Sequence, residues 1–400
     1  MSNSQNIVNQ FKTEFPLIYR KIDILCNGIA NDEENLLTKI YLSQNPLDVR
    51  RTGNSGLQIM FYGTNISLSV GVHFGEESKI SKQSPYHLEK NQDKIYIVDS
   101  RDNYKTPIEL KWEIPTWYKE DLGNGIKNQG TFVQHEGEHT AIASITTGCV
   151  YFNMGGPCAF CAIGKESEEK ERSERKSNLI NTLSLVATDA NIQNINLTGG
   201  NTLTKDRGAY QYLPFVKAIR DKNKNVPIAI EMSPPEIEAS KEVFEKLKQS
   251  GVNGVVTNIE FWNDDIRKEL MPIKGKFTKE EYLEAYKNAI EVFGKNKVVC
   301  GIIVGVEDLT ETYNAIKEVS KIGVIPEIYP FKPNDKSKMA NYPKTDIDTI
   351  LIASLFADNE IKKHKLNVKE CVGCPKCGGC GITQQLADIE YNYDFGEENI

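Results

Sequence analysis

Apolar and polar positions follow their clearest pattern between residues 140 and 333. Short, nearly continuous apolar runs alternate there with segments whose apolar residues recur every three or four positions. The runs predict strands that are buried on both faces of a parallel sheet, and the other segments predict the helices that cover it. The predicted strands are 140–146, 194–200, 227–233, 254–262, 297–306 and 324–333, and the predicted helices are 178–193, 209–223, 237–250, 279–293 and 310–321.

This alternation of strands and helices predicts the fold class α/β. A full barrel of about eight units would need more units than the sequence provides, so we expect a partial (β/α)6 TIM-like barrel over residues 131–345. The charged run 165–177 contains acidic and basic residues in equal number. We expect it to be a solvated helix rather than a binding surface.

The flanking parts of the chain have different patterns. Residues 1–50 carry apolar side chains at helical spacing, as in Val8, Phe11 and Phe15. Residues 57–117 contain short strand-like runs that are divided by Gly, Asn, Asp and Pro. We therefore expect an N-terminal helix-plus-β lead-in domain over residues 1–130, and a cysteine-rich C-terminal extension over residues 346–400.

Composition narrows the classes of partner. A net charge of −7 and a pI near 5.5 argue against a broad basic face for nucleic acid. The longest apolar stretches, such as 298–306, are far shorter than a membrane span, and the N-terminus lacks the basic-then-apolar pattern of a secretory signal. We expect a cytoplasmic protein that acts on a small molecule, with no nucleic acid and no membrane as partners.

Most of the nine cysteines fall into two tight groups, which in a reducing compartment favours metal ligation over disulfides. In the first group, Cys149 follows the first predicted barrel strand, and a glycine-containing loop returns Cys158 and Cys161 to ligand range. Three thiolates suit a [4Fe-4S] cluster in which one iron keeps open coordination sites. The alternatives are a structural zinc site and unligated cysteines.

The second group repeats a cysteine at every third position of a glycine-rich segment, at Cys371, Cys374, Cys377 and Cys380. Zinc ribbons separate two C-x-x-C pairs by about a dozen residues or more, whereas a compact C-x-x-C-x-x-C arc suits iron-sulfur ligation. We expect an auxiliary iron-sulfur cluster here, with zinc as the alternative. Cys371 is either a fourth ligand or a spare cysteine.

Residues 135–139 read His-Glu-Gly-Glu-His and satisfy the H-E-x-x-H pattern of zinc proteases. That pattern holds a metal only on a helix, where the two histidines share a face. Gly137 interrupts any helix here, and the predicted strand 140–146 follows at once. We therefore expect no protease-type zinc site at this position.

The last two cysteines of the first group read Cys158-Ala159-Phe160-Cys161. This ending resembles the C-x-aromatic-C motif of the radical S-adenosylmethionine (SAM) superfamily. The gap between Cys149 and Cys158 holds eight residues, whereas three are usual in that superfamily. The resemblance implies that Cys149, Cys158 and Cys161 hold a SAM-binding [4Fe-4S] cluster and that Phe160 packs against the adenine of SAM.

Two glycine-rich elements extend the resemblance. The segment that contains Thr198, Gly199 and Gly200 resembles the Gly-Gly-Glu element whose backbone accepts the methionine amino group, with Asn201 in place of the usual Glu. The segment from Gly301 through Val304 to Gly305 resembles the Gly-x-Ile-x-Gly element that flanks the adenine.

Three charged residues are placed by the same resemblance to meet the amino group, the ribose and the carboxylate of SAM. They are Glu231, Glu260 and Arg267. An arginine in this role would make a charge-assisted contact with a carboxylate. The alternative for each of the three is a structural ion pair.

A narrower resemblance covers nearly the whole chain, to biotin-synthase-like radical SAM proteins encoded beside nitrilases. Within it, the match supports Cys374, Cys377 and Cys380 most directly as ligands of the auxiliary cluster. The matching segments are 84–90, the gap between the first cysteines, 206–209, 233–236, 271–272, 292–294 and the cysteine-rich tail followed by Gln384 and Gln385.

The resemblance implies an enzyme that reductively cleaves SAM to a 5′-deoxyadenosyl radical, which then abstracts hydrogen from a small-molecule substrate. The auxiliary cluster would donate sulfur, pass an electron or bind the substrate. A ferredoxin or flavodoxin would be the typical reductant. The alternatives are a radical methylase and a non-catalytic iron-sulfur or zinc protein that serves as a redox partner or scaffold.

Overall fold

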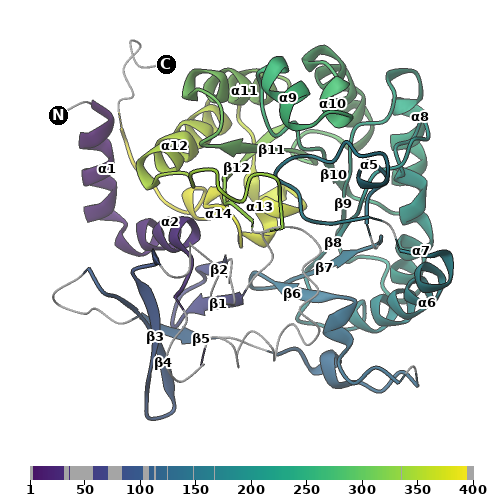
Figure 1. The fold of residues 1–400 in the computed structure, drawn as a ribbon, viewed down its shortest axis with the longest axis horizontal. Helices are drawn as coiled ribbons and strands as arrows, with labels where there is room; N and C mark the ends of the chain where they lie inside the picture. The colour runs from purple at the N-terminus through teal and green to yellow at the C-terminus, as the bar shows by residue number, and fades with distance from the viewer. Residues whose placement is uncertain are drawn as a thin grey trace.

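The fold comes from a computed structural model, which describes residues 3–30, 36, 57–70, 83–101, 108–111, 114–123, 125–146, 148–165, 167–334 and 336–393. Figure 1 shows a large sheet that is surrounded by helices, and a smaller sheet beside the N-terminal helices. None of the helices in these ranges is long and apolar enough to cross a membrane.

The large sheet is the partial barrel that the sequence predicted, and we call it the half-barrel. Its strands follow one another in chain order, with parallel pairing from β7 to β12 and one antiparallel strand, β6, at the edge beside β7. The strands are β6 (Gln134–Glu136), β7 (Thr140–Ser144), β8 (Asn194–Thr198), β9 (Ile228–Glu231), β10 (Gly254–Val256), β11 (Val298–Val304) and β12 (Ile325–Pro330). Their side chains are almost all buried, as expected for a parallel sheet that is covered on both faces.

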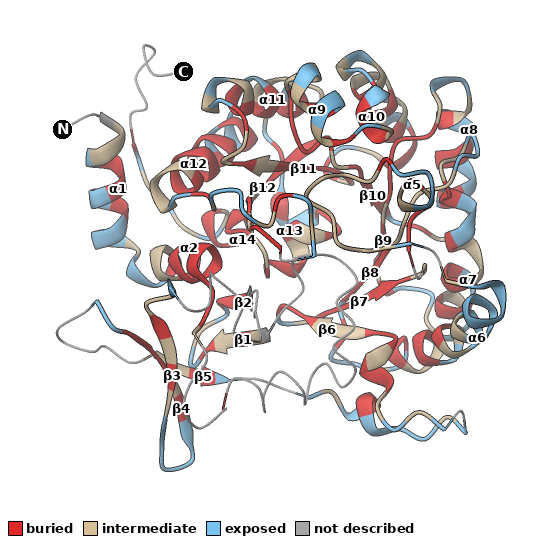
Figure 2. Cartoon of the chain, in the orientation of Figure 1, coloured by how far each residue is buried: buried red, intermediate tan, exposed pale blue. Residues whose placement is uncertain are grey.

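Helices cover the outer face of this sheet, and Figure 2 shows that they bury one side and expose the other. α10 begins with a capping box, in which Thr278 and Glu281 satisfy each other's backbone N–H groups. The main helices are α6 (Glu169–Val186), α7 (Leu213–Lys222), α8 (Ile237–Gln249), α10 (Lys279–Phe293), α11 (Leu309–Lys321) and α12 (Ile347–Lys363), and the shorter ones are α5 (Val150–Asn153), α9 (Asp264–Leu270) and the 3-10 turns η3 (Ala209–Tyr212) and η4 (Lys274–Lys276).

Two element boundaries differ from the sequence-based prediction. The charged run 165–177 is not a separate helix, because α6 includes most of it and ends at Val186. A turn follows, in which Asp189 accepts a hydrogen bond from the backbone N–H of Asn191 (2.9 Å). β10 ends at Val256 rather than at residue 262, since Glu260 has a left-handed backbone (φ +64°) and forms only an isolated bridge with β11.

The small sheet is antiparallel and lies in the N-terminal part of the chain. Its strand order is β2-β1-β5-β4-β3. Its strands are β1 (Leu57–Phe61), β2 (Ser67–Val70), β3 (Tyr86–Asn91), β4 (Lys94–Asp99) and β5 (Ile108–Lys111), and the 3-10 turns η1 (Thr116–Lys119) and η2 (Gln129–Thr131) lead to the half-barrel. The predicted helical positions 31–35 and 37–50 and the strand positions 71–74 lie outside the described residues.

Two N-terminal helices connect the sheets, α1 (Asn3–Glu14) and α2 (Pro16–Asn27). Pro16 begins α2 and separates it from α1. On one side of α2, Asp23 accepts a hydrogen bond from the hydroxyl of Tyr86 (2.5 Å), and Arg20 pairs with Asp99. On the other side, both helices pack against α12. The N-terminal segment is therefore in contact with both the small sheet and the half-barrel.

The C-terminal segment lies on the inner face of the half-barrel. It contains η5 (Val368–Glu370), α13 (Cys374–Cys377) and α14 (Thr383–Leu386). A side chain at Gly373 would meet Val256 and Ala229, and one at Gly381 would overlap Glu327. Because side chains alternate along a strand, Ala229 and Glu231 face the same side of β9, and Glu327 and Tyr329 the same side of β12. The cysteine-rich segment therefore packs on the face opposite the helices.

Candidate functional site

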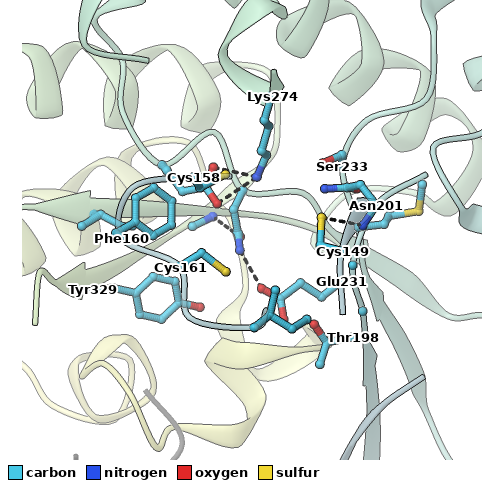
Figure 3. Close-up of a pocket in the computed structure, with 18 of the residues that line it drawn as sticks. Cys149, Cys158, Phe160, Cys161, Thr198, Asn201, Glu231, Ser233, Lys274 and Tyr329 are labelled. Atoms are coloured by element: carbon cyan, nitrogen blue, oxygen red, sulfur yellow. Dashed lines mark hydrogen bonds and ion pairs between the residues drawn. The ribbon is translucent and has the colours of Figure 1, made fainter. Parts of the chain in front are cut away.

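A cavity of about 280 Å³ opens at the carboxyl ends of the parallel strands, where barrel proteins place their reactive groups. Its lining includes Thr198 and Glu231 at the ends of β8 and β9, and Tyr329 near the end of β12. Cysteines from both groups also line it: Cys149, Cys158 and Cys161, here called the loop set, and Cys374 and Cys380 from the C-terminal segment. The structure thus brings together two groups that are far apart in the sequence. Figure 3 shows the loop set around the cavity.

Cys149 is held against the first glycine-rich element, which contains Gly199 and Gly200. The backbone N–H of Asn201 donates a hydrogen bond to Cys149 Sγ (3.4 Å), and the N–H of Gly200 donates to Thr146 Oγ1 (2.7 Å). A Cβ atom at Gly200 would overlap the carbonyl of Gly148 and lie 2.7 Å from Cys149 Cα. A glycine is therefore required at position 200 by close backbone approach, and not by its φ angle.

The rest of the cysteine loop is held mainly through its backbone. The N–H of Ala159 donates to the carbonyl of Leu270 (2.6 Å), and the N–H of Met339 donates to the carbonyl of Ala159 (3.2 Å). The ring of Phe160 lines the cavity and packs edge-on against Phe261, with 5.7 Å between centroids. The end of α9 at Leu270 and the segment around Met339 therefore hold Cys158 and Cys161 in place.

A polar network spans the strand ends behind the loop set. Asn258 donates from Nδ2 to Glu231 Oε1 (2.7 Å) and accepts at Oδ1 from the N–H of Gly301 (2.9 Å). A Cβ atom at Gly301 would overlap Asn258. The glycine thus lets one amide side chain connect β9 and β11, and it keeps the Glu231 carboxylate oriented toward the cavity (Figure 3).

A buried ion pair closes another side of the cavity. Lys274 Nζ lies 2.8 and 2.7 Å from the two carboxylate oxygens of Glu260. Burial alone would lower the pKa of Lys274, but the charge of Glu260 outweighs it and raises that pKa. Lys274 is therefore charged at neutral pH. Burial raises the pKa of the Cys158 thiol, and the charge of Lys274, which stands close enough to interact with it, partly offsets that effect.

The C-terminal cysteines require close contact with a distant turn. Gly137, between β6 and β7, has φ +63°, and a Cβ atom there would overlap the carbonyl of Cys377 and lie 3.2 Å from its Sγ. This glycine belongs to the His-Glu-Gly-Glu-His motif. The first two residues of the motif, His135 and Glu136, lie in β6, and Gly137 lies in a turn. The two histidines therefore do not share a helix face.

Comparison with known proteins places these residues in a family. Residues 143–318, which run from β7 into α11 and include the loop set, match the family model of the radical SAM superfamily. This part of the chain is a radical SAM domain. The protein is therefore a radical SAM enzyme, and the family implies a [4Fe-4S] cluster and SAM as cofactors.

Solved structures of radical SAM proteins resemble the chain only distantly. Methylornithine synthase (PylB) is 15% identical with a TM-score of 0.43, and the match covers 61% of this chain and 66% of that one. A radical SAM methyltransferase from Sphaerobacter thermophilus is 13% identical with a TM-score of 0.43, over 70% and 77% of the two chains. The FeFe-hydrogenase maturase HydG from Carboxydothermus hydrogenoformans is 16% identical with a TM-score of 0.42, over 56% and 52%. No curated protein sequence matches significantly.

The residues of the loop set fit the cluster that the family implies. All nine cysteines are free, and burial raises the pKa of the Cys161 thiol to about 11, so without a metal it would be neutral. Iron binds thiolate and reverses that preference. The backbone N–H at Asn201 already points at a sulfur, as is typical of the hydrogen bonds that surround iron-sulfur clusters. In the described ranges, however, no three His, Cys, Asp or Glu side chains are arranged to hold a single metal ion.

Most of the predicted SAM-contacting residues line the cavity, but two do not. The guanidinium of Arg267 is fully buried and donates to the carbonyls of Phe261 (3.1 Å), Trp262 (3.2 Å) and Phe277 (3.1 Å). It ties α9 to its neighbours and also pairs with Asp264, so Arg267 makes the structural ion pair that the sequence left open as the alternative to a contact with the SAM carboxylate. Val304 is buried in β11, and its carbonyl accepts from Thr345 Oγ1 (2.5 Å). The lining does include Phe160, Thr198, Gly199, Gly200, Glu231, Glu260 and Gly301.

Among the four C-terminal cysteines, Cys371 is separate from the others. It lies in an apolar cluster with Val256, Val299 and Ile325, away from the cavity. Cys377 is buried beside Gly137, and Cys374 and Cys380 line the cavity. We call Cys374, Cys377 and Cys380 the arc set.

The arc set is surrounded by buried charge that sequence reasoning missed. Lys21 of α2 is fully buried and donates to the carbonyl of Gly378 and to Gln385 Oε1 (2.8 Å). Burial lowers the pKa of Lys21 to about 8 and raises the pKa of Glu327 to about 7. Lys21 sits at helical spacing among apolar residues, and Glu327 within an apolar strand, which are the signals that could have revealed them.

Proposed function

We propose that this radical SAM enzyme cleaves SAM at a [4Fe-4S] cluster held by the loop set and acts on a small molecule bound in the same cavity, beside an auxiliary iron-sulfur cluster held by the arc set. The main support is that both cysteine groups line one cavity. A reactive group generated at the loop set would meet whatever lies against the arc set. When bound, the first cluster supplies the electron that cleaves SAM, and the resulting 5′-deoxyadenosyl radical abstracts hydrogen.

The protein's own residues have three tasks in this proposal. Asn201 and Lys274 stabilise negative charge on the loop set, through an N–H to Cys149 and a charge near Cys158. Phe160, Gly199 and Gly200 offer an aromatic face and exposed backbone to SAM. The surrounding strands and loops exclude water, which matters because a radical is quenched by the first group it meets.

The proposal includes the partners that the sequence predicted. Ferredoxin or flavodoxin would be the reductant, and the substrate would be a small molecule rather than nucleic acid or membrane. The site of action would be the cytoplasm. A radical methylase remains the second candidate function, and it would be recognised by label from the SAM methyl group in the product.

The proposal is tested by anaerobic reconstitution with iron and sulfide, followed by incubation with SAM and dithionite. We expect 5′-deoxyadenosine from the wild type and none from Cys158→Ala. Cys300→Ala is the matched control, because Cys300 is a buried core residue outside the cavity lining and should retain the activity. If the wild type binds iron but releases no 5′-deoxyadenosine, the enzyme proposal is wrong.

The auxiliary cluster has its own test. We expect Cys374→Ala to lose about four irons per chain if the auxiliary cluster is also a cubane, while Cys371→Ala loses none. Equal iron loss in both variants would make Cys371 a ligand. The purified wild type could instead contain zinc that Cys374→Ala lacks. That result would show that the arc set is a structural zinc site and not an auxiliary cluster.

A further inference from the structure

Five charged side chains line the cavity, and three of them already have partners. Glu260 and Lys274 form an ion pair, and Glu231 accepts a hydrogen bond from Asn258. The remaining two are Glu136 and Lys332. Neither has a hydrogen bond or an ion pair with any residue that the structure describes. These two groups need another partner, because burial of an unpaired charge is costly.

Lys332 follows β12 and contributes the unpaired cation. Its Nζ atom is buried and lacks a hydrogen-bond acceptor among the described residues, although the side chain lines the cavity. An ammonium group has three N–H donors and is strongly hydrated when it is free. A buried ammonium on a side chain that lines a cavity is therefore suited to an anionic group of a ligand.

Glu136, at the end of β6, contributes an unpaired carboxyl group, and burial and the charge of Glu231 raise its pKa to about 7. The residue is only 7% exposed, and its side chain lines the same cavity. It lies near enough to Lys332 for their charges to interact, yet the two form no ion pair. Ser233 lines the same cavity, is 2% exposed and also lacks a partner for its Oγ atom among the described residues. The cavity thus offers one cation, one carboxyl group and one hydroxyl with no protein partner in the described ranges.

We propose that this part of the cavity binds a small zwitterion, an amino acid or a similar amino-carboxylate, whose carboxylate accepts from Lys332 Nζ and whose ammonium donates to Glu136. The inference names the substrate class for the proposed function and rests on it. A carboxylate and an ammonium satisfy both buried charges at once, whereas a neutral ligand would leave both unpaired. Ser233 Oγ is placed to complete the hydrogen bonding of either end.

One rival role for Lys332 is charge compensation of the arc set. Its charge interacts with Cys380, so it could simply offset the negative thiolates of the auxiliary cluster. A second rival is that the pair holds the methionine end of SAM, which is itself an amino-carboxylate. These roles differ from the proposal in what the variants would change, namely the potential of the auxiliary cluster or the affinity for SAM.

The experiment measures binding of the twenty L-amino acids to the reconstituted enzyme by calorimetry, each beside its decarboxylated amine and its N-acetyl derivative. We expect at least one amino acid to bind at least tenfold more tightly than both of its analogues. Lys332→Met should abolish the preference for that amino acid over its decarboxylated amine. Glu136→Gln should abolish the preference for it over its N-acetyl derivative. Lys332→Arg should keep part of the first preference, since it keeps the charge.

Matched controls are available nearby on the chain. Lys338→Met and Glu138→Gln change the same residue types at exposed positions and should bind as the wild type does. The proposal is overturned if no amino acid is preferred over its two analogues. It is also overturned if Lys332→Met weakens SAM binding by a similar factor, or if it shifts the potential of the auxiliary cluster without changing ligand preference.

Failure of this inference can be told apart from failure of the proposed function. Iron content and substrate-free release of 5′-deoxyadenosine are measured on the same preparations. SAM cleavage without any amino acid preference would remove only the substrate class. Iron-loaded protein that prefers an amino acid but never cleaves SAM would retain the binding site and remove the enzyme proposal.

Discussion

The loop set and the arc set face one cavity, but they are held in different ways. The loop set depends on contacts close to its own strand ends, chiefly the backbone of residues 200 and 201 and the ion pair of Glu260 with Lys274. The arc set lies inside the half-barrel and depends on distant elements, namely Lys21 of α2 and Gly137 after β6. The first site is thus built by the barrel, and the second by the segments that fill it.

The largest expected effect is on the loop set. Gly200→Ala would place a Cβ atom against Gly148 and Cys149, which must then move. Because a shift of about 1 Å in a reacting group costs on the order of a hundredfold in rate, we expect 5′-deoxyadenosine release to fall by at least about that factor. Iron bound by the arc set should remain.

The control for this change is Gly294→Ala. Gly294 ends α10 with φ +93°, and nothing lies within 4 Å of an added Cβ atom. We expect a loss of stability of about 1 kcal/mol from backbone strain and unchanged activity per folded enzyme. Equal inactivation by both substitutions would show that close packing at residue 200 is unimportant.

The next effect separates the arc set from the loop set. Gly137→Ala combines a left-handed backbone with an overlap against Cys377, so we expect about 2 to 4 kcal/mol of destabilisation and loss of the arc-set metal. Thermal unfolding measures the destabilisation, and metal analysis measures the loss of metal from the arc set. Gly123→Ala has a similar φ of +68° but open space around it, so only the strain should appear. Retention of all metal by Gly137→Ala would contradict the dependence on this turn.

The smallest effect tests the ion pairs of Asp99, which lies at the end of β4 in the small sheet. Burial alone would raise the pKa of Asp99, but hydrogen bonds and charge from Arg101 and Arg20 outweigh it and lower the pKa to about 2. A lowered carboxyl pKa adds stability above the ordinary value of 3.8, and that stability is lost as the pH falls from about 4 to about 2. Allowing for partial exposure, we expect about 1 kcal/mol.

Urea unfolding of the metal-free protein between pH 5 and pH 2 measures this contribution of Asp99 to the free energy of unfolding. Asp99→Asn should flatten the acid slope by the same amount and leave the metal content at pH 7 unchanged. An identical slope in the wild type and the variant would mean that the Asp99 pairs contribute nothing to stability.

Much of the fold could be predicted because it depends on local patterns. The strand and helix periodicities located the β/α units, and the Cys-x-Phe-Cys ending with its glycine-rich elements pointed to the family. Boundaries were less accurate where a single backbone angle decided them, as at Glu260, whose positive φ ends the predicted fourth strand early. Arg267 does not line the cavity, because its guanidinium pairs with Asp264 and donates to three backbone carbonyls, and sequence carries no sign of which carbonyls a fold will offer.

By itself, the sequence determined the β/α units of the half-barrel, the spacing of the loop-set cysteines and the resemblance to the radical SAM superfamily, because each depends on a pattern within a short stretch of chain. Only the tertiary structure decided that Cys374 and Cys380 face the same cavity as the loop set, that Cys371 does not, and that Lys332 and Glu136 lie there unpaired. Those relations arise when the C-terminal segment packs inside the half-barrel, and contacts between such distant segments leave no periodic signal in the sequence.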